Sequence, residues 1–250
     1  MHPTTVAIDL AKNVFQLAVA DSNHRLIEQH RLTRTQFTRF FDNRQIDRIV
    51  MEACGSAHHW ARTFSARGIE VILLPPQYVR ASVRRNKTDA ADAKALIEAA
   101  RDCDLRPVRI KSIEQQALQA LHRTRSLWMA TRTARINALR GFCREFGLHI
   151  PVGARTGIEA ISRAVADDQS ALPELLRPTL RLLLDEIRVL ETRIAQTERS
   201  LAEAAANSNA CKLLMTIPGI GLLSSTAIAA ATSGSVAHFR SARHFASWFG

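Results

Sequence analysis

A regular heptad spacing in the second half of the chain constrains the fold more than any other feature. Positions separated by alternating steps of four and three residues carry Leu176, Leu180, Leu183, Ile187, Leu190, Ile194, Thr197 and Leu201. Such a seam predicts a long helix that packs against another helix as a coiled coil. Pro178 lies inside this register, so we expect the first seam position to fall in a kink or before the helix begins.

The partner of this seam is open at the level of sequence. Residues 110–146 contain no proline and one glycine, Gly141, and predict a second long helix. The two helices could form a hairpin within one chain, or the seam could pair with a second copy in a homo-oligomer.

The first hundred residues have a different pattern, in which strands and helices alternate. Apolar runs rich in β-branched residues predict strands over 5–10, 14–20, 48–52 and 69–74, and residues 24–32 complete an antiparallel meander. Helices are predicted over 35–43 and over 57–67, the second ending at Gly68. This alternation predicts an α/β domain whose sheet is covered by helices.

The charge of the chain points to a polyanionic partner. Its 250 residues carry a net charge of +11, which favours nucleic acid over a membrane surface because aromatic residues are few. Four scattered cysteines without a C-x-x-C pair predict reduced thiols and a cytoplasmic protein. No segment approaches the roughly 20 apolar residues of a membrane span, and we see no secretory signal.

Much of this positive charge lies within residues 106–150, which hold nine basic and two acidic residues. A solvated helix face usually mixes the two signs, so this nearly one-signed segment predicts contact with a phosphate backbone. The arginines expected to make this contact are Arg123, Arg125, Arg132, Arg135 and Arg140.

Four acids are candidates for chemistry. Asp9 and Glu52 end predicted strands, and Asp89 and Asp92 lie one turn apart on a helix that Thr88 could cap. Each alone could be an ordinary turn, strand-end or helix acid. Together they would suit two Mg²⁺ or Mn²⁺ ions, hard cations that prefer oxygen ligands and can assist phosphoryl displacement.

Two further segments could hold nucleic acid. Four basic residues precede the aspartate pair and would place a phosphate beside the metal ions: Arg80, Arg84, Arg85 and Lys87. In the motif P-G-I-G at residues 218–221, Gly219 and Gly221 lie between two predicted helices. Such glycines let backbone N–H groups approach a phosphate, as in a helix-hairpin-helix motif. A tight turn explains the motif alone equally well, but the charge of +11 favours DNA contact.

Four motifs together resemble the DEDD transposases of bacterial insertion sequences, of the insertion sequence one-hundred-ten type, which are related to pilin-gene-inverting recombinases. They are A-I-D-L-A-K at 7–12, M-E-A-C-G at 51–55, N-K-T-D-A-A-D-A at 86–93 and I-P-G-I-G at 217–221. The resemblance runs through the whole chain. It implies that Asp9, Glu52, Asp89 and Asp92 are the catalytic and metal-binding acids of an RNase H-like, RuvC-like site.

The resemblance also implies an architecture and partners. We expect a RuvC-like domain over 1–105, a coiled-coil region over 106–206 and the start of a helical transposase domain over 207–250. It implies DNA as substrate, a structured guide RNA and a dimer or tetramer. The family's C-terminal serine nucleophile matches none of Ser224, Ser225, Ser241 or Ser247, so we expect this chain to stop before it.

Two other functions fit the same residues. A RuvC-like nuclease would hydrolyse DNA without a serine step, and a non-catalytic nucleic-acid-binding regulator would need only the positive charge. An actin-like ATPase would require a glycine-rich phosphate loop after the first strand, and residues 9–13 contain no glycine.

Overall fold

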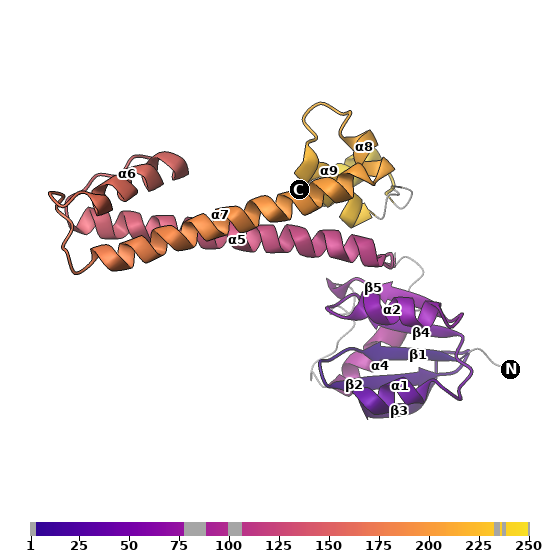
Figure 1. Cartoon of the computed structure of the whole chain (residues 1–250). Coiled ribbons are helices and arrows are strands. Elements are labelled where there is room, and N and C mark those ends of the chain that lie inside the picture. The colour runs from indigo at the N-terminus through magenta and orange to yellow at the C-terminus, as the bar shows by residue number, and fades with distance from the viewer. Residues whose placement is uncertain (1–3, 78–88, 100–106, 233–235, 237–238, 250) are drawn as a thin grey trace. The chain divides into compact units, whose positions relative to one another are not determined.

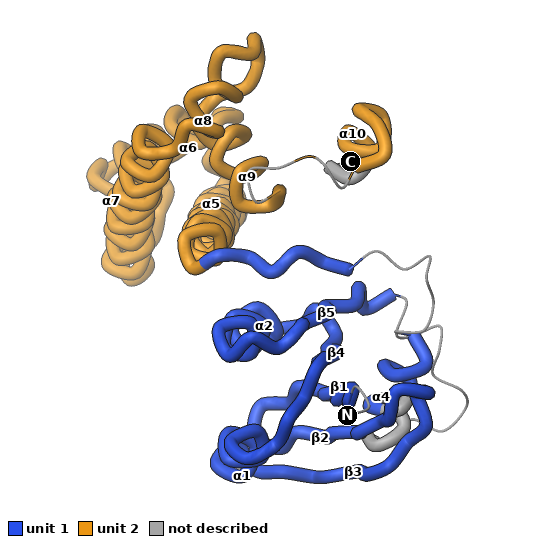
Figure 2. The backbone as a smooth tube through the Cα atoms, turned by 90° about the vertical axis from the view of Figure 1, so that its right-hand side faces the viewer, with its two compact units in different colours: residues 1–112 blue, residues 113–250 orange. Residues whose placement is uncertain are grey.

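The computed structural model describes residues 4–77, 89–99, 107–232, 236 and 239–249. The chain divides into two compact units, residues 1–112 and residues 113–250, which are coloured separately in Figure 2. Each unit has its own hydrophobic core.

Unit 1 is a mixed α/β structure built on a five-stranded sheet, as predicted (Figure 1). Its strands are β1 (Thr5–Asp9), β2 (Val14–Ala20), β3 (Leu26–Thr33), β4 (Arg48–Glu52) and β5 (Glu70–Leu74). Their order is β3-β2-β1-β4-β5. β1 pairs with β2 antiparallel and with β4 parallel, and β4 pairs with β5 parallel.

The helices of unit 1 cover both faces of this sheet. They are α1 (Arg34–Phe40), α2 (Ala57–Ser65) and α4 (Asp89–Ala99). Val6, Ile8 and Met51 point to the face covered by α1 and α2, where they meet a cluster of aromatic rings around Phe37 and Trp60. Because strand side chains alternate between faces, Ala7 and Val50 point to the other face, against α4. Figure 2 shows α2 and α4 on opposite sides of the strands.

Unit 2 is helical, and its two longest helices lie side by side (Figure 1). Its helices are α5 (Ile113–Glu145), α6 (Ala154–Ala166), α7 (Arg177–Ala206), α8 (Asn209–Leu214), α9 (Leu222–Thr232) and α10 (Ala242–Phe249). Among the described residues, no helix combines the length and the apolar character that crossing a membrane requires.

The heptad seam is the face of α7 that is buried. Leu180, Ile187, Leu190 and Leu201 are each at most 5% exposed, and Leu183 is half-buried. α7 packs against α5 of the same chain, so α5 is one partner of the seam and the two helices form an intrachain hairpin. Leu176 precedes the helix as its N-cap and Pro178 occupies the first turn, as expected from the missing proline N–H.

A buried arginine closes the connection between α6 and α7. Arg177 is 6% exposed, and its guanidinium donates hydrogen bonds to the carbonyl oxygens of Leu172, Val165, Asp167 and Ser170. The Asp167 carbonyl also accepts the Ser170 N–H, so Arg177 adds to the local backbone hydrogen bonds of this connection. This role cannot be read from the sequence, because Arg177 looks like any first-turn helix residue.

Candidate metal and nucleic-acid site

Asp9 and Glu52 are brought together by the parallel pairing of β1 and β4. Ile8 is paired with Met51, so the next residues along the two strands, Asp9 and Glu52, continue the register at neighbouring strand ends. Both are half-buried. Alternation places them on the face that α4 covers, opposite Ile8 and Met51. Two of the four predicted acids thus share one edge and one face of the sheet.

The thiol of Cys54 reports the combined charge of these two acids. Burial raises the pKa of Cys54, and the negative charges of Glu52 and Asp9 raise this pKa further. Both carboxylates therefore act on one small region just after β4. Composition predicts only a reduced thiol at Cys54, although its position two residues after Glu52 places it at the same strand end.

Asp89 and Asp92 lie in the first turn of α4, the helix that packs on β1 and β2. Their side chains, and the cap expected at Thr88, are outside the described part of the chain. The predicted basic approach formed by Arg80, Arg84, Arg85 and Lys87 is likewise outside the described residues. Among the side chains that are described, His, Cys, Asp and Glu form no group of three or more able to hold a metal ion.

The donor chemistry at the two described acids fits a hard divalent cation. Asp9 and Glu52 offer carboxylate oxygens, the ligands that Mg²⁺ and Mn²⁺ prefer. The raised pKa of Cys54 describes the chain without a bound ion, and a cation held by the two carboxylates would lower it.

Two residues on α2 hold the end of unit 1 instead of joining the acidic site. His58 Nδ1 accepts a hydrogen bond from the backbone N–H of Lys111 at 3.2 Å, and Arg62 Nη1 donates to the Lys111 carbonyl at 2.6 Å. Burial, together with the positive charges of Lys111 and Arg62, lowers the pKa of His58 to about 4. His58 is therefore neutral near pH 7, which its role as acceptor requires.

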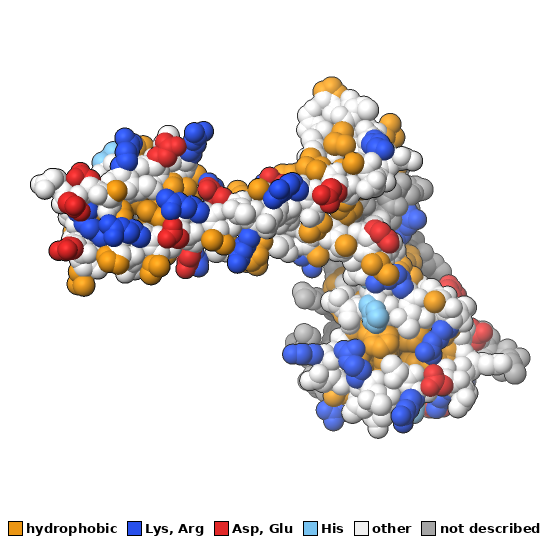
Figure 3. Space-filling view, viewed as in Figure 1, with side chains coloured by type: hydrophobic (Ala, Val, Ile, Leu, Met, Phe, Trp, Pro, Cys, Tyr) orange, Lys and Arg blue, Asp and Glu red, His pale blue; other side chains and the backbone are white. Residues whose placement is uncertain are grey.

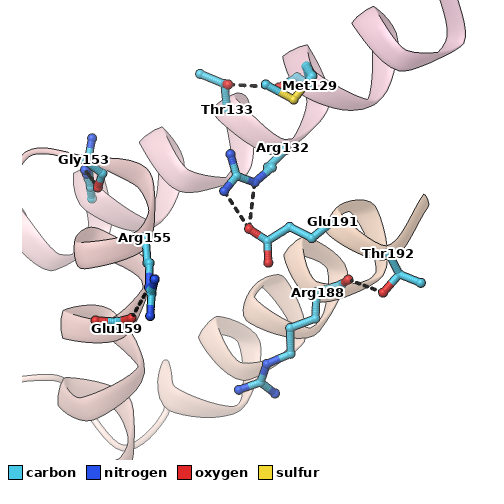
Figure 4. A network of polar contacts seen from close by, with 10 residues as sticks. Met129, Arg132, Thr133, Gly153, Arg155, Glu159, Arg188, Glu191 and Thr192 are labelled. Atoms are coloured by element: carbon cyan, nitrogen blue, oxygen red, sulfur yellow. Dashed lines mark hydrogen bonds and ion pairs between the residues drawn. The ribbon is translucent and has the colours of Figure 1, made fainter. Parts of the chain in front are cut away.

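The arginines of α5 do not form the one-signed face inferred from sequence. Most have partners within unit 2, where α7 supplies the glutamates: Arg125 pairs with Glu198, Arg132 with Glu191 and Arg135 with Glu186. Figure 4 shows Arg132 reaching across to Glu191, and Figure 3 shows acidic side chains among the basic ones along the helix pair. The charge count within residues 106–150 missed these acids because they lie 51 to 73 positions further along the chain.

Arg140 and Arg123 differ from these three. Arg140 Nη2 donates hydrogen bonds to the carbonyl oxygens of Pro151 and Gly153 in the α5–α6 connection. Arg123 is exposed and has no ion-pair partner among the described residues. Nucleic-acid contact remains a prediction for all five arginines, and Arg123 is the one whose charge is least committed to the fold.

The P-G-I-G segment forms an exposed turn between α8 and α9. Gly219 has a φ of +88°, a conformation that favours glycine, and the N–H of Ile220 donates to the Ile217 carbonyl. A Cβ placed on Gly219 or Gly221 would meet nothing within 4 Å. The space in front of both backbones is therefore open, which suits a tight turn and a phosphate contact equally.

Comparisons with known proteins agree with the resemblance seen in the motifs. Residues 6–147 match the family model for DEDD transposases of the IS110 type, and residues 211–250 match the one for the transposase IS116/IS110/IS902 family. A probable family 20 transposase of Pseudomonas aeruginosa is 39% identical over the whole chain and is covered over 74% of its own length.

Two further relatives have the same character. The transposase for insertion sequence element IS1111A of Coxiella burnetii is 34% identical over 98% of this chain, and the alignment covers 67% of that protein. The transposase for insertion sequence element IS1328 of Yersinia enterocolitica is 34% identical over 90% of this chain and 67% of its own length.

Proposed function

The chain belongs to the IS110-type transposase family of bacterial insertion sequences, and from this membership we propose that it carries the divalent-metal site at which such a transposase cleaves DNA strands for exchange. The site comprises Asp9, Glu52, Asp89 and Asp92. The observation that carries the proposal is the convergence of Asp9 and Glu52 at neighbouring ends of β1 and β4, on the face covered by the helix that begins with Asp89.

The role of the protein in this reaction is to hold four carboxylates in place. β1 and β4 fix the backbones of Asp9 and Glu52 by parallel pairing, and α4 packs on β1 and β2 through Ala93, Leu96 and Ile97. Two bound Mg²⁺ or Mn²⁺ ions would stabilise the attacking and leaving oxygens of a phosphodiester. Carboxylates held close together repel one another, and a bound cation relieves this repulsion, so the same side chains that would bind the ion also favour its binding.

The finer architecture follows from the same premise. We assign a RuvC-like, RNase H-like fold to unit 1, supported by the sheet order β3-β2-β1-β4-β5 and by the family match over residues 6–147. We assign coiled-coil packing to α5 and α7, supported by the buried heptad seam. A homo-oligomer and a structured guide RNA are further parts of the proposal and rest on family membership alone.

The test is cleavage of supercoiled DNA by the whole chain in the presence and absence of Mg²⁺ and Mn²⁺. Asp9→Asn and Glu52→Gln should each abolish cleavage while leaving DNA binding intact. Asp185→Asn, which removes an equal charge from an exposed position on α7, should cleave as the wild type does. Metal-dependent nicking that Asp9→Asn leaves unchanged would refute the proposed site.

The products distinguish this function from the two alternatives. Joined strands support a recombinase, whereas nicked or linear DNA without joined products would identify a nuclease. DNA binding without cleavage under any metal condition would identify a binding protein. Light scattering of the protein alone and sequencing of co-purified RNA test the oligomer and the guide RNA separately.

A further inference from the structure

Next to the strand ends that carry Asp9 and Glu52, the neighbouring strands β2 and β3 carry an uncharged and a basic side chain. Asp9 is paired directly with Gln16 of β2, and Gln16 is paired directly with Arg31 of β3. Directly opposed residues of antiparallel strands point to the same face of a sheet. Glu52, Asp9, Gln16 and Arg31 therefore form one line across four neighbouring strands, from β4 to the edge strand β3.

The burial pattern of β3 shows which face Arg31 occupies. Glu28, His30 and Leu32 are half-buried on the α1 side, where the His30 ring contacts Phe40 and Leu32 joins the core. The alternate residues Gln29, Arg31 and Thr33 are exposed. They must point to the opposite face, which is the face of Asp9 and Glu52.

Arg31 makes no polar contact that the described part of the chain shows. Its guanidinium has no hydrogen bond or ion pair within the described part of the chain, and the half-buried amide of Gln16 also lacks a partner there. The neighbouring cations differ, since Arg44 pairs with Glu28 and Arg34 donates to the Lys12 carbonyl. A cation that shares a face with the two carboxylates and has no partner among the described residues is available for a ligand that carries negative charge.

The spacing suits a nucleic-acid strand. Arg31 lies two strands from Asp9, a backbone separation of roughly 10 Å at about 4.8 Å per strand. Because the arginine side chain is long, its guanidinium can lie closer to Asp9 than the backbone of Arg31 does, at a distance comparable with that between neighbouring phosphates of one strand. Arginine also matches phosphate geometry by donating two parallel hydrogen bonds.

We propose that Arg31 is a positioning residue that binds a phosphate of the cleaved DNA strand adjacent to the phosphate held at Asp9 and Glu52, with the Gln16 amide between them. This proposal rests on the proposed function of the acidic site. It adds the course of the DNA strand over the protein: the DNA backbone passes from the acids across β2 to the edge strand β3.

The test compares Arg31→Gln with Arg39→Gln in the full chain without added metal. Arg39 is an exposed arginine on α1, on the opposite side of the sheet. Both variants remove one positive charge, but only Arg31→Gln removes it from the face of the acids. Binding is measured by fluorescence anisotropy of a labelled single-stranded oligodeoxynucleotide over a range of salt concentrations. Thermal unfolding checks that both variants fold.

Arg31→Gln should weaken DNA binding about tenfold, the effect of losing one charge-assisted phosphate contact. It should also reduce the slope of log K against log salt by about 0.7, one phosphate's share for a single strand. Arg39→Gln should leave both quantities unchanged. Equal affinity and equal slope for Arg31→Gln and the wild type would overturn the proposal, as would a loss confined to an RNA oligonucleotide of the same sequence.

A second measurement separates this inference from the proposed function. In the cleavage assay, Arg31→Gln should raise KM for DNA much more than it lowers kcat, whereas Asp9→Asn should remove kcat. If Asp9→Asn abolishes cleavage while Arg31→Gln leaves KM unchanged, the acidic site stands and the role of Arg31 fails. If neither variant alters cleavage, the site itself is wrongly placed.

Discussion

Arg132 and Glu191 join the two longest helices through a forked contact. Nε and Nη2 of Arg132 both donate to Oε1 of Glu191, over 2.9 and 2.6 Å. Arg132 is 18% exposed, so water screens this ion pair less than a fully exposed one. The contact ties the middle of α5 to α7 with a geometry that lysine could not reproduce.

We therefore predict that Arg132→Gln destabilises the helix pair by about 1 kcal/mol, the usual size of a partly exposed charged hydrogen bond. Arg123→Gln, which removes an exposed arginine of the same helix, should leave the unfolding free energy unchanged and weaken DNA binding. Urea denaturation and a DNA-binding titration on both variants measure this contrast. A larger binding defect in Arg132→Gln than in Arg123→Gln would show that phosphate contact outweighs the helix-pairing role.

The Cys54 thiol offers a measurement of the acidic site that needs no catalysis. Because the negative charge of Glu52 contributes to the raised pKa of Cys54, Glu52→Gln should lower that pKa. Mg²⁺ binding should lower it in the wild type for the same electrostatic reason. The pH dependence of iodoacetamide alkylation, followed by mass spectrometry of the Cys54 peptide, reports both effects. A thiol pKa that does not respond to Mg²⁺ would argue that no cation binds beside it.

His58 should make the attachment of Lys111 to α2 sensitive to acid. The pKa of His58 is about 4 in the folded chain and about 6.5 when unfolded. The unfolded state therefore takes up a proton first as pH falls, and the contribution of neutral His58 to stability, complete above pH 6.5, is lost progressively down to pH 4. Protonated His58 cannot accept the Lys111 N–H.

Hydrogen exchange measures this attachment directly. The protection factor of the Lys111 amide should fall between pH 6.5 and pH 4, while that of the Val108 amide, bonded to the Leu73 carbonyl, should change much less. In His58→Gln, the Lys111 protection factor should no longer depend on pH in this range. Parallel pH dependence in the variant and the wild type would assign the effect to another group.

Gly157 and Gly141 predict opposite effects of the same substitution. A Cβ on Gly157 in α6 would lie 2.7 Å from Arg140 Nη2, which is held by two carbonyl oxygens. Gly157→Ala should therefore destabilise unit 2 by about 1–3 kcal/mol. Gly141 lies in α5 with nothing within 4 Å of such a Cβ, so Gly141→Ala should stabilise by about 0.5–1 kcal/mol through helix propensity. Thermal denaturation of the two variants decides the signs.

The strands of unit 1 could be predicted closely because each carries its own local pattern. The predicted runs at 14–20 and 48–52 coincide with β2 and β4, and the predicted helix over 57–67 stops at Ser65, just before Gly68 with its φ of +80°. Both long helices also lie where the sequence predicts them, α5 beginning three residues later than expected. Periodicity and turn residues determine such elements without reference to distant parts of the chain.

What sequence could not supply is the set of partners for charged residues. The arginines of α5 looked unpaired because Glu186, Glu191 and Glu198 enter only once α7 folds back along α5. The alignment of Arg31 with Asp9 likewise depends on strand register, which a list of predicted strands does not contain. Both arrangements depend on contacts between residues far apart in the chain, which local sequence propensities do not determine.

The parallel neighbours β1 and β4 are separated in the chain by the whole β2–β3–α1 segment. A nascent polypeptide that has emerged only as far as α1 carries Asp9 but not yet Glu52. The proposed metal site therefore cannot form until the meander has closed and β4 has paired with β1. Under the proposed function, a partly synthesised chain could therefore not cut DNA before unit 1 has folded as far as β4.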